Sequence, residues 1–229
     1  MHDWMLTTGM SKMEIVEDSA PAHRQEVVAY ENIIRKQLDI IYNTEVGKCL
    51  LNLLNPQKKI WILPNPKLSS TAMTFPCKTV KEGGGIRIHF NPENWVGTED
   101  DTLVHELTHA LRFSYNRFYR KNILHDSYPD SEEFLATQIS NVYRSSRGKS
   151  QLYGAYHYSE GYWSSKGSIY QAFVESPELI MALKFCLDYE ELVSRIARLK
   201  HLEFNPFNDY PVLERMALSK VGGGKFMPL

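Results

Sequence analysis

Two histidines and a glutamate near the middle of the chain have the spacing of a metal-binding helix. In the stretch His105-Glu106-Leu107-Thr108-His109 the two imidazoles are four residues apart, so on a helix they lie on the same face. Two imidazoles held in this way can bind one zinc ion, and the intervening glutamate can take a proton from a water molecule beside the ion. The pattern therefore predicts a hydrolytic zinc site with His105 and His109 as ligands and Glu106 as the general base.

The alternative is a chance match on an ordinary buried helix. In a chain of this composition an HExxH match at some position has a probability of about one to two per cent. The residues around the motif are apolar, which predicts that the helix is buried: Leu103, Val104, Leu107, Ala110 and Leu111. Burying two histidines and a glutamate without partners is costly, and a metal ion supplies the partner. The metal-binding interpretation is therefore favoured.

A third zinc ligand is expected downstream, because a catalytic zinc ion has three protein ligands and one exchangeable position. The segment 129–138 opens a predicted helix that begins with Glu132 and Glu133. Glu133 shares a helix face with small residues, which would allow close packing against the HExxH helix, whereas Glu132 shares a face with larger apolar side chains. Glu133 is therefore the preferred ligand and Glu132 the alternative. Both also fit an ordinary helix start capped by Asp130.

A structural zinc ion would need a fourth protein ligand, and His125 is the candidate for that position. It lies 16 residues after His109, too far for the extended pattern HExxHxxGxxH. With His125 bound, the protein would be a non-catalytic, zinc-stabilised binding module. This interpretation remains the alternative to an enzyme.

The HExxH motif is typical of zinc peptidases. Hydrolysis of a peptide bond also requires a hydrogen-bond donor for the negative oxygen that develops on the substrate carbonyl. The stretch QLYGAYHYSEGYWSSKG at 151–167 offers several tyrosines and a histidine. Among them we favour Tyr156 as the catalytic donor, with Tyr153 and His157 as alternatives. Packing of this aromatic loop on the core is the competing interpretation.

Periodicity and turn signals predict the elements that position these residues. Two helices are expected before the motif, the first from residue 24 to a break at 43–44 and the second ended by Asn55-Pro56. Strands are expected at 60–63 and 86–90, while turn residues dominate 67–82. The first helix carries an apolar stripe of Val27, Val28, Ile33, Ile34, Leu38 and Ile41. Further helices are predicted near 99–116, 131–146, 168–175, 177–187, 189–200 and 211–220. The predicted class is α+β and mostly helical, with a small sheet packed against the HExxH helix.

The composition restricts the class of protein. The chain has 229 residues, 43% of them hydrophobic, which suits one domain with a sizeable core. Its 26 basic and 27 acidic residues are nearly balanced, so a broad surface for nucleic acid is not expected. No apolar run approaches the roughly 20 residues of a membrane span. The three cysteines lack a CxxC pair and predict buried or incidental thiols rather than disulfides: Cys49, Cys77 and Cys186.

Three segments are predicted along the chain. Residues 1–21 form a polar, loosely ordered leader without the basic and apolar regions of a secretory signal. Residues 22–220 form a single domain. The glycine-rich stretch at 221–229 is predicted to be a flexible tail.

The sequence HELTHALR, followed by a helix that opens with Glu132-Glu133, resembles the NleD-type bacterial effector metallopeptidases and, more distantly, the clostridial neurotoxin light chains. Three matches outside the zinc motif carry this resemblance over about residues 40–160. The stretch NTEVGKCLLN at 43–52 is similar to the family's T-x-x-G-[KR]-x-L-L. Glu132-Glu133, followed by small residues, resembles its E-E-x-x-T, in which the second glutamate is the expected ligand. Asn141-Val142-Tyr143-Arg144 with Gly148 resembles its N-x-aromatic-R-x-x-x-G.

The resemblance implies a zincin-like fold and a zinc-dependent endopeptidase that hydrolyses peptide bonds of a specific target protein, with one Zn²⁺ per chain. It also implies a bacterial origin, secretion by a route independent of a signal peptide, and action in the cytosol of a target cell. A host signalling protein is the candidate substrate, and a secretion chaperone is a further expected partner. The alternative is an antibacterial toxin domain that pairs with an immunity protein and uses the same chemistry.

Overall fold

The computed structural model of the protein describes residues 21–54, 58–64, 72–77, 85–95, 97, 99–118, 128, 130–153, 163–164 and 185–209. Contacts divide the chain into two compact units, Met1–Phe118 (unit 1) and Tyr119–Leu229 (unit 2). The described elements are mostly helical with a small sheet, which confirms the α+β class. The predicted leader up to residue 20 and the predicted tail lie outside the described residues, and the single domain over 22–220 stays a prediction.

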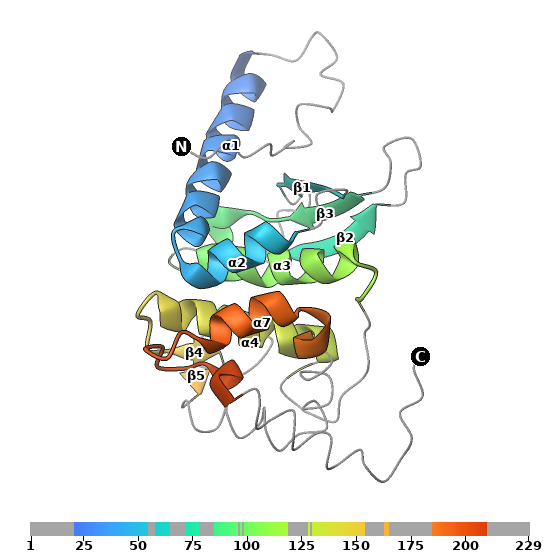
Figure 1. Ribbon diagram of the computed structural model, residues 1–229. Helices are drawn as coiled ribbons and strands as arrows, with labels where there is room; N and C mark the ends of the chain where they lie inside the picture. Colours follow the sequence, from blue (N-terminus) through green and yellow to red (C-terminus); the bar gives the residue numbers. More distant parts are fainter. Residues whose placement is uncertain are drawn as a thin grey trace. The chain divides into compact units, whose positions relative to one another are not determined.

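Two helices open unit 1, α1 at Pro21–Tyr42 and α2 at Glu45–Leu53 (blue in Figure 1). Thr44 caps α2, because its side-chain oxygen accepts the Gly47 backbone N–H at 2.9 Å and its hydroxyl donates to the Ile41 carbonyl at 2.9 Å. A side chain at Gly47 would clash with that same carbonyl. The Thr-x-x-Gly of this segment thus forms a tight junction between α1 and α2.

The buried face of α1 is narrower than the predicted stripe. Ile34, Leu38 and Ile41 are buried as predicted. Val28, however, is 54% exposed and Ile33 is 43% exposed. Neighbouring helix residues such as Ile33 and Ile34 point about 100° apart, so on a helix that is buried along one narrow face only one of them lies in the core. The prediction that Val28 and Ile33 lie on the buried stripe is wrong.

The sheet of unit 1 has the strand order β1-β3-β2, with β1 parallel and β2 antiparallel to β3. Its strands are β1 at Lys59–Leu63, β2 at Met73–Cys77 and β3 at Gly85–His89. The predicted strands at 60–63 and 86–90 are confirmed within one residue. β2 lies inside the segment 67–82, so the prediction that turns fill this segment is wrong at 73–77.

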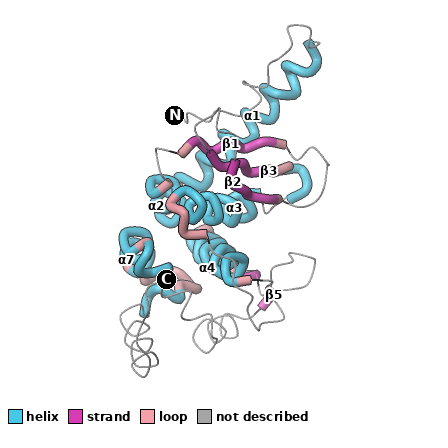
Figure 2. Tube along the Cα trace, turned by 90° about the vertical axis from the view of Figure 1, so that its right-hand side faces the viewer, coloured by secondary structure: helices cyan, strands magenta, loops and turns pink. Residues whose placement is uncertain are grey.

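Alternation along the strands decides which side chains face α3, the helix at Glu99–Ser114. Ile86 and Ile88 of β3 are buried, while Arg87 between them is half-buried. Thr74 of β2 pairs with Ile88 and therefore shares its face of the sheet. Because α3 contacts both β2 and β3, this face lies on α3, as Figures 1 and 2 show.

α3 is buried along almost its whole length, from Asp100 to Arg112. Three carboxylates in its first turn and Arg112 in its last turn suit the helix dipole. The helix follows a 3-10 turn, η3 at Pro92–Trp95. The bounds of α3 agree with the prediction of 99–116 within two residues.

The first described helix of unit 2 is α4 at Ser131–Ser146, which coincides with the predicted helix. The chain leaves α4 through Gly148, whose φ of 69° is the left-handed conformation that glycine adopts without strain. The N–H of Gly148 donates to the Ser145 carbonyl and that of Lys149 to the Arg144 carbonyl, each at 3.0 Å. These are the two bonds of a Schellman motif, so the glycine of the Asn-x-x-Arg-x-x-x-Gly pattern ends the helix.

The remaining described elements of unit 2 are short. β4 at Leu152–Tyr153 pairs antiparallel with β5 at Trp163–Ser164. α7 spans Glu190–Ala197, inside the predicted 189–200, and is followed by η4 at Pro206–Asp209. The predicted helices at 168–175 and 211–220 lie outside the described residues, as does 177–187 except for its last three residues.

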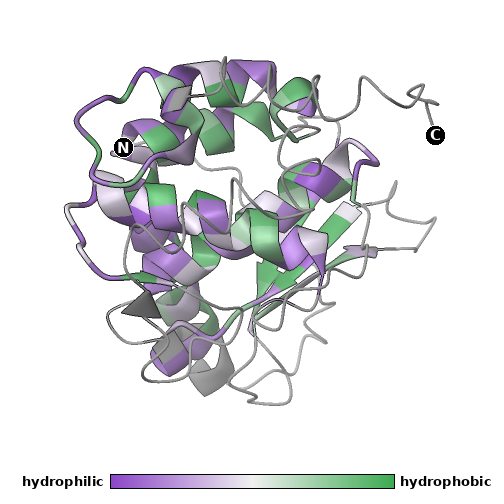
Figure 3. Cartoon of the chain, turned by 90° about the horizontal axis from the view of Figure 1, so that it is seen from below, coloured by the Kyte–Doolittle hydropathy of each residue, from purple (hydrophilic) through white to green (hydrophobic). Residues whose placement is uncertain are grey.

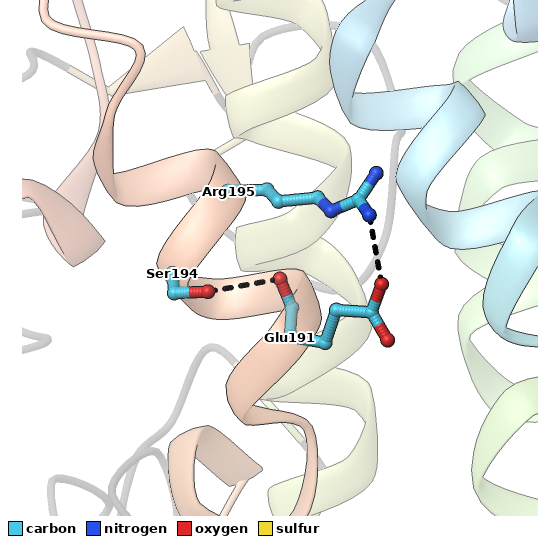
Figure 4. Close-up of polar contacts among 3 residues, drawn as sticks. All are labelled: Glu191, Ser194 and Arg195. Carbon is cyan, nitrogen blue, oxygen red and sulfur yellow. Dashed lines mark hydrogen bonds and ion pairs between the residues drawn. The ribbon is translucent and has the colours of Figure 1, made fainter.

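α7 illustrates how the helices of this chain divide into apolar and polar faces. Its apolar residues Leu192, Val193 and Ile196 are buried. On the exposed side Arg195 pairs with the Glu191 carboxylate at 2.9 Å, and the Ser194 hydroxyl donates to the Glu191 carbonyl at 3.2 Å (Figure 4). Figure 3 shows the same mixture of apolar and polar stretches along the other described helices.

Two further sequence predictions concern thiols and membranes. Cys49 and Cys186 are buried free thiols, as predicted. In the part of the chain that the structure describes, no helix combines the length and the apolar character that crossing a bilayer requires.

Candidate metal centre

His105 and His109 face each other on α3. Their Nε2 atoms are 3.1 Å apart, and their rings meet edge-on with centroids 4.7 Å apart. Two nitrogen ligands of a tetrahedral zinc ion, each about 2.0–2.1 Å from the metal, lie about 3.3 Å apart. The two imidazoles therefore already have nearly the separation that a shared zinc ion requires, as the sequence spacing predicts.

An aromatic cluster holds the His109 ring. Phe118 lies against it with a centroid distance of 5.5 Å, and Phe118 itself stacks on Phe113 at 3.8 Å with an angle of 10° between the planes. An imidazole packed against a fixed ring has fewer orientations open to it. The cluster thus helps to keep His109 directed towards His105.

Glu106 is buried together with the two histidines, the exposed fractions being 2% for His105, 5% for Glu106 and 4% for His109. Its carboxylate Oε2 accepts a hydrogen bond from the Thr74 hydroxyl at 2.6 Å. This contact connects the helix to β2, the strand that the sequence prediction missed. The predicted general base is therefore oriented by a residue 32 positions away in the sequence.

In unit 2, Glu133 stands in the first turn of α4. The Asp130 side chain caps this helix by accepting the N–H groups of Glu132 at 2.9 Å and Glu133 at 3.1 Å. The predicted cap is confirmed. Both glutamates are buried. Their burial is unusual for acidic residues, which are almost never fully buried unless paired.

His105, His109 and Glu133 lie close enough to bind a metal ion. Each offers one ligand atom, and these atoms are all within 4.8 Å of one another. The group contains Glu133 and, among the described residues, neither Glu132 nor a fourth metal-binding side chain. These are the three residues that the sequence predicts as ligands, and their role as zinc ligands stays a prediction. His125, the candidate for a fourth ligand, lies outside the described residues.

Two residues of the Asn-x-aromatic-Arg pattern, Asn141 and Arg144, anchor β4 to α4. The Asn141 side chain accepts the Tyr153 N–H at 2.7 Å and donates to the Tyr153 carbonyl at 2.9 Å. Arg144 donates to the Gln151 carbonyl at 2.8 Å and to the Tyr153 hydroxyl at 3.0 Å, and its guanidinium lies over the Tyr153 ring at 4.5 Å. The sequence pattern alone does not indicate this structural role.

Tyr153, an alternative donor for the developing oxyanion, is thus a buried residue whose main chain and hydroxyl are both held by α4. The preferred donor Tyr156 and the second alternative His157 lie outside the described residues. The choice among the three stays a prediction. The structure does fix Tyr153, the described residue that directly precedes Gly154, because α4 holds its main chain and its hydroxyl.

His89, at the end of β3, is a packed strand histidine. Its ring lies 5.0 Å from that of Phe75. Partial burial, followed by the charge of Arg87, lowers its pKa from the usual value. His89 is therefore neutral at pH 7.

No protein-family model, curated protein or solved structure matches this chain. The resemblance to NleD-type metallopeptidases, which rests on HELTHALR and the flanking motifs, stays a prediction. The candidate metal centre therefore stands on the chemistry and the geometry of its own residues.

Proposed function

We propose that the protein is a zinc-dependent endopeptidase with a zincin-like fold. The proposal rests on the buried group His105, His109 and Glu133, whose ligand atoms lie within 4.8 Å of one another beside a further buried glutamate. Two imidazoles and one carboxylate are one of the ligand sets found in catalytic zinc sites. They leave one coordination position for water or substrate. When bound, zinc would polarise the substrate carbonyl and make water a stronger nucleophile at neutral pH.

Glu106 acts as the general base and then as the acid. It takes a proton from the attacking water and passes it to the nitrogen of the leaving amine. The Thr74 hydroxyl occupies Oε2 at 2.6 Å, so Oε1 is the oxygen that carries the proton. The low exposure of His105, Glu106 and His109 excludes bulk water and strengthens each electrostatic interaction in the site. Tyr156 is the proposed donor to the oxyanion.

The position of β2 supports a peptide as the substrate. β2 is an end strand of the described sheet, and no described strand pairs with its outer edge. An extended peptide can add to such an edge through main-chain hydrogen bonds. The Thr74 side chain of this strand contacts Glu106, so a peptide on the edge would run past the general base.

The motif resemblance extends the proposal to the biological setting. On that basis the protein is a secreted bacterial effector or toxin that cleaves a specific protein in a target cell. The chemistry of the site is the same whether the target is a host signalling protein or a bacterial protein. The proposed substrate class thus rests on the site, whereas the proposed target rests on the motif resemblance.

Removal of the metal tests the proposed function. We expect the full chain, incubated with a library of proteome-derived peptides, to generate new peptide N-termini that mass spectrometry identifies. Dialysis against a zinc chelator should reduce this cleavage to background, and about one equivalent of zinc per chain should restore it. Cleavage that persists in metal-free protein, or a zinc-loaded protein that produces no new N-termini, would contradict the proposal.

A further inference from the structure

The hydroxyl of Thr74 contacts two oxygen atoms of Glu106. It lies 2.6 Å from the carboxylate Oε2 and 3.1 Å from the main-chain carbonyl oxygen. A hydroxyl has one proton, and the shorter contact to a charged acceptor takes it. The Thr74 O–H therefore donates to the Glu106 carboxylate, while the longer contact holds β2 close to the backbone of α3.

Sheet register places Thr74 at this point. β2 pairs antiparallel with β3, and Thr74 stands opposite the buried Ile88 on the face that covers α3. The residues beside Thr74, Met73 and Phe75, belong to the opposite face. A shift of the register by one residue would remove the hydroxyl from Glu106 altogether.

A glutamate side chain has three rotatable bonds, and the contact to Thr74 selects one arrangement of them. We infer that Thr74 is a positioning residue, which holds Oε2 of Glu106 so that Oε1 is presented to the attacking water. This inference rests on the proposed function for the role of Glu106. Thr74 acts through Glu106, since the polar contacts of its hydroxyl with described residues are with the carboxylate and the carbonyl of Glu106.

Two variants of Thr74 separate this role from a structural one. Thr74→Val keeps the β-branched shape but removes the hydroxyl, whereas Thr74→Ser keeps the hydroxyl and removes a methyl group. With a peptide that the wild type cleaves, we expect Thr74→Val to lower kcat by about 10- to 100-fold and to leave KM within about twofold. Thr74→Ser should retain kcat within about threefold. Met73→Val on the same strand, at an exposed side chain, serves as the control.

Crystal structures of the zinc-loaded variants supply a readout that needs no activity. We expect one rotamer of Glu106 in the wild type and in Thr74→Ser, and a displaced or divided Glu106 carboxylate in Thr74→Val. If Glu106 keeps its rotamer in Thr74→Val, or if Thr74→Ser is as slow as Thr74→Val, the inference is overturned while the proposed function stands. If the wild type cleaves no peptide, the proposed function fails, and the rotamers still decide whether Thr74 positions Glu106.

Discussion

Glu106→Gln is expected to bind zinc like the wild type and to lose about 10³- to 10⁴-fold in kcat/KM on a cleavable peptide. The amide has the shape of the carboxylate and can still accept a hydrogen bond from Thr74, which bonds Glu106 at 2.6 Å. It cannot take a proton from water, and the loss of a general base costs up to about 10⁴-fold in rate. Zinc content by elemental mass spectrometry and peptide cleavage, measured on the same preparation, check both expectations.

The matched control for this variant is Glu99→Gln, at the first turn of the same helix. It removes the same charge from α3 and should leave kcat/KM within about twofold, because it weakens only the interaction with the helix dipole. A zinc-loaded Glu106→Gln that cleaves the peptide as fast as Glu99→Gln would exclude Glu106 as the general base. Loss of zinc in Glu106→Gln would instead mean that the glutamate helps to hold the metal.

Glu133→Ala is expected to weaken zinc binding by roughly 10²- to 10³-fold, whereas Glu132→Ala should leave the zinc affinity nearly unchanged. Four-ligand zinc sites bind with about 10–16 kcal/mol, so one ligand contributes on the order of 3–4 kcal/mol. Both glutamates are buried in the first turn of α4, and Asp130 caps both N–H groups. The pair thus compares two similar truncations, of which only one removes a member of the proposed ligand set.

The zinc affinities of Glu133→Ala and Glu132→Ala can be compared through the rise in melting temperature that zinc causes in each variant. A metal that binds only the folded protein raises the free energy of unfolding. At metal concentrations well above Kd, this increase is proportional to the logarithm of the ratio of metal concentration to Kd. The rise should persist in Glu132→Ala and shrink in Glu133→Ala at the same zinc concentration, whatever each substitution does to the metal-free protein. An equal rise in the two variants would remove Glu133 from the ligand set.

Local patterns predicted the parts of the site that depend on neighbouring residues. The spacing of His105 and His109 places both imidazoles on one face of the helix, where their Nε2 atoms lie 3.1 Å apart. The bounds of α4 and the Asp130 cap follow from local hydrogen bonding in the same way. These features need no knowledge of the remainder of the chain.

Contacts between distant segments could not be predicted in this way. β2 is five residues long and contains Pro76, which weakens its strand signal, although an end strand tolerates proline. With the strand missed, the contact of Thr74 with Glu106 could not be found. The anchoring of Tyr153 by Asn141 and Arg144 depends on a return of the chain after α4 that periodicity does not show.

An anomalous difference map measured at the zinc absorption edge, on crystals of the full chain grown with zinc, tests the assigned metal centre most directly. The expected map has one strong peak per chain, at about 2.0–2.2 Å from Nε2 of His105, Nε2 of His109 and a carboxylate oxygen of Glu133. A map without a peak at the two histidines, or with a peak there that Glu133 does not contact, would contradict the proposed zinc site.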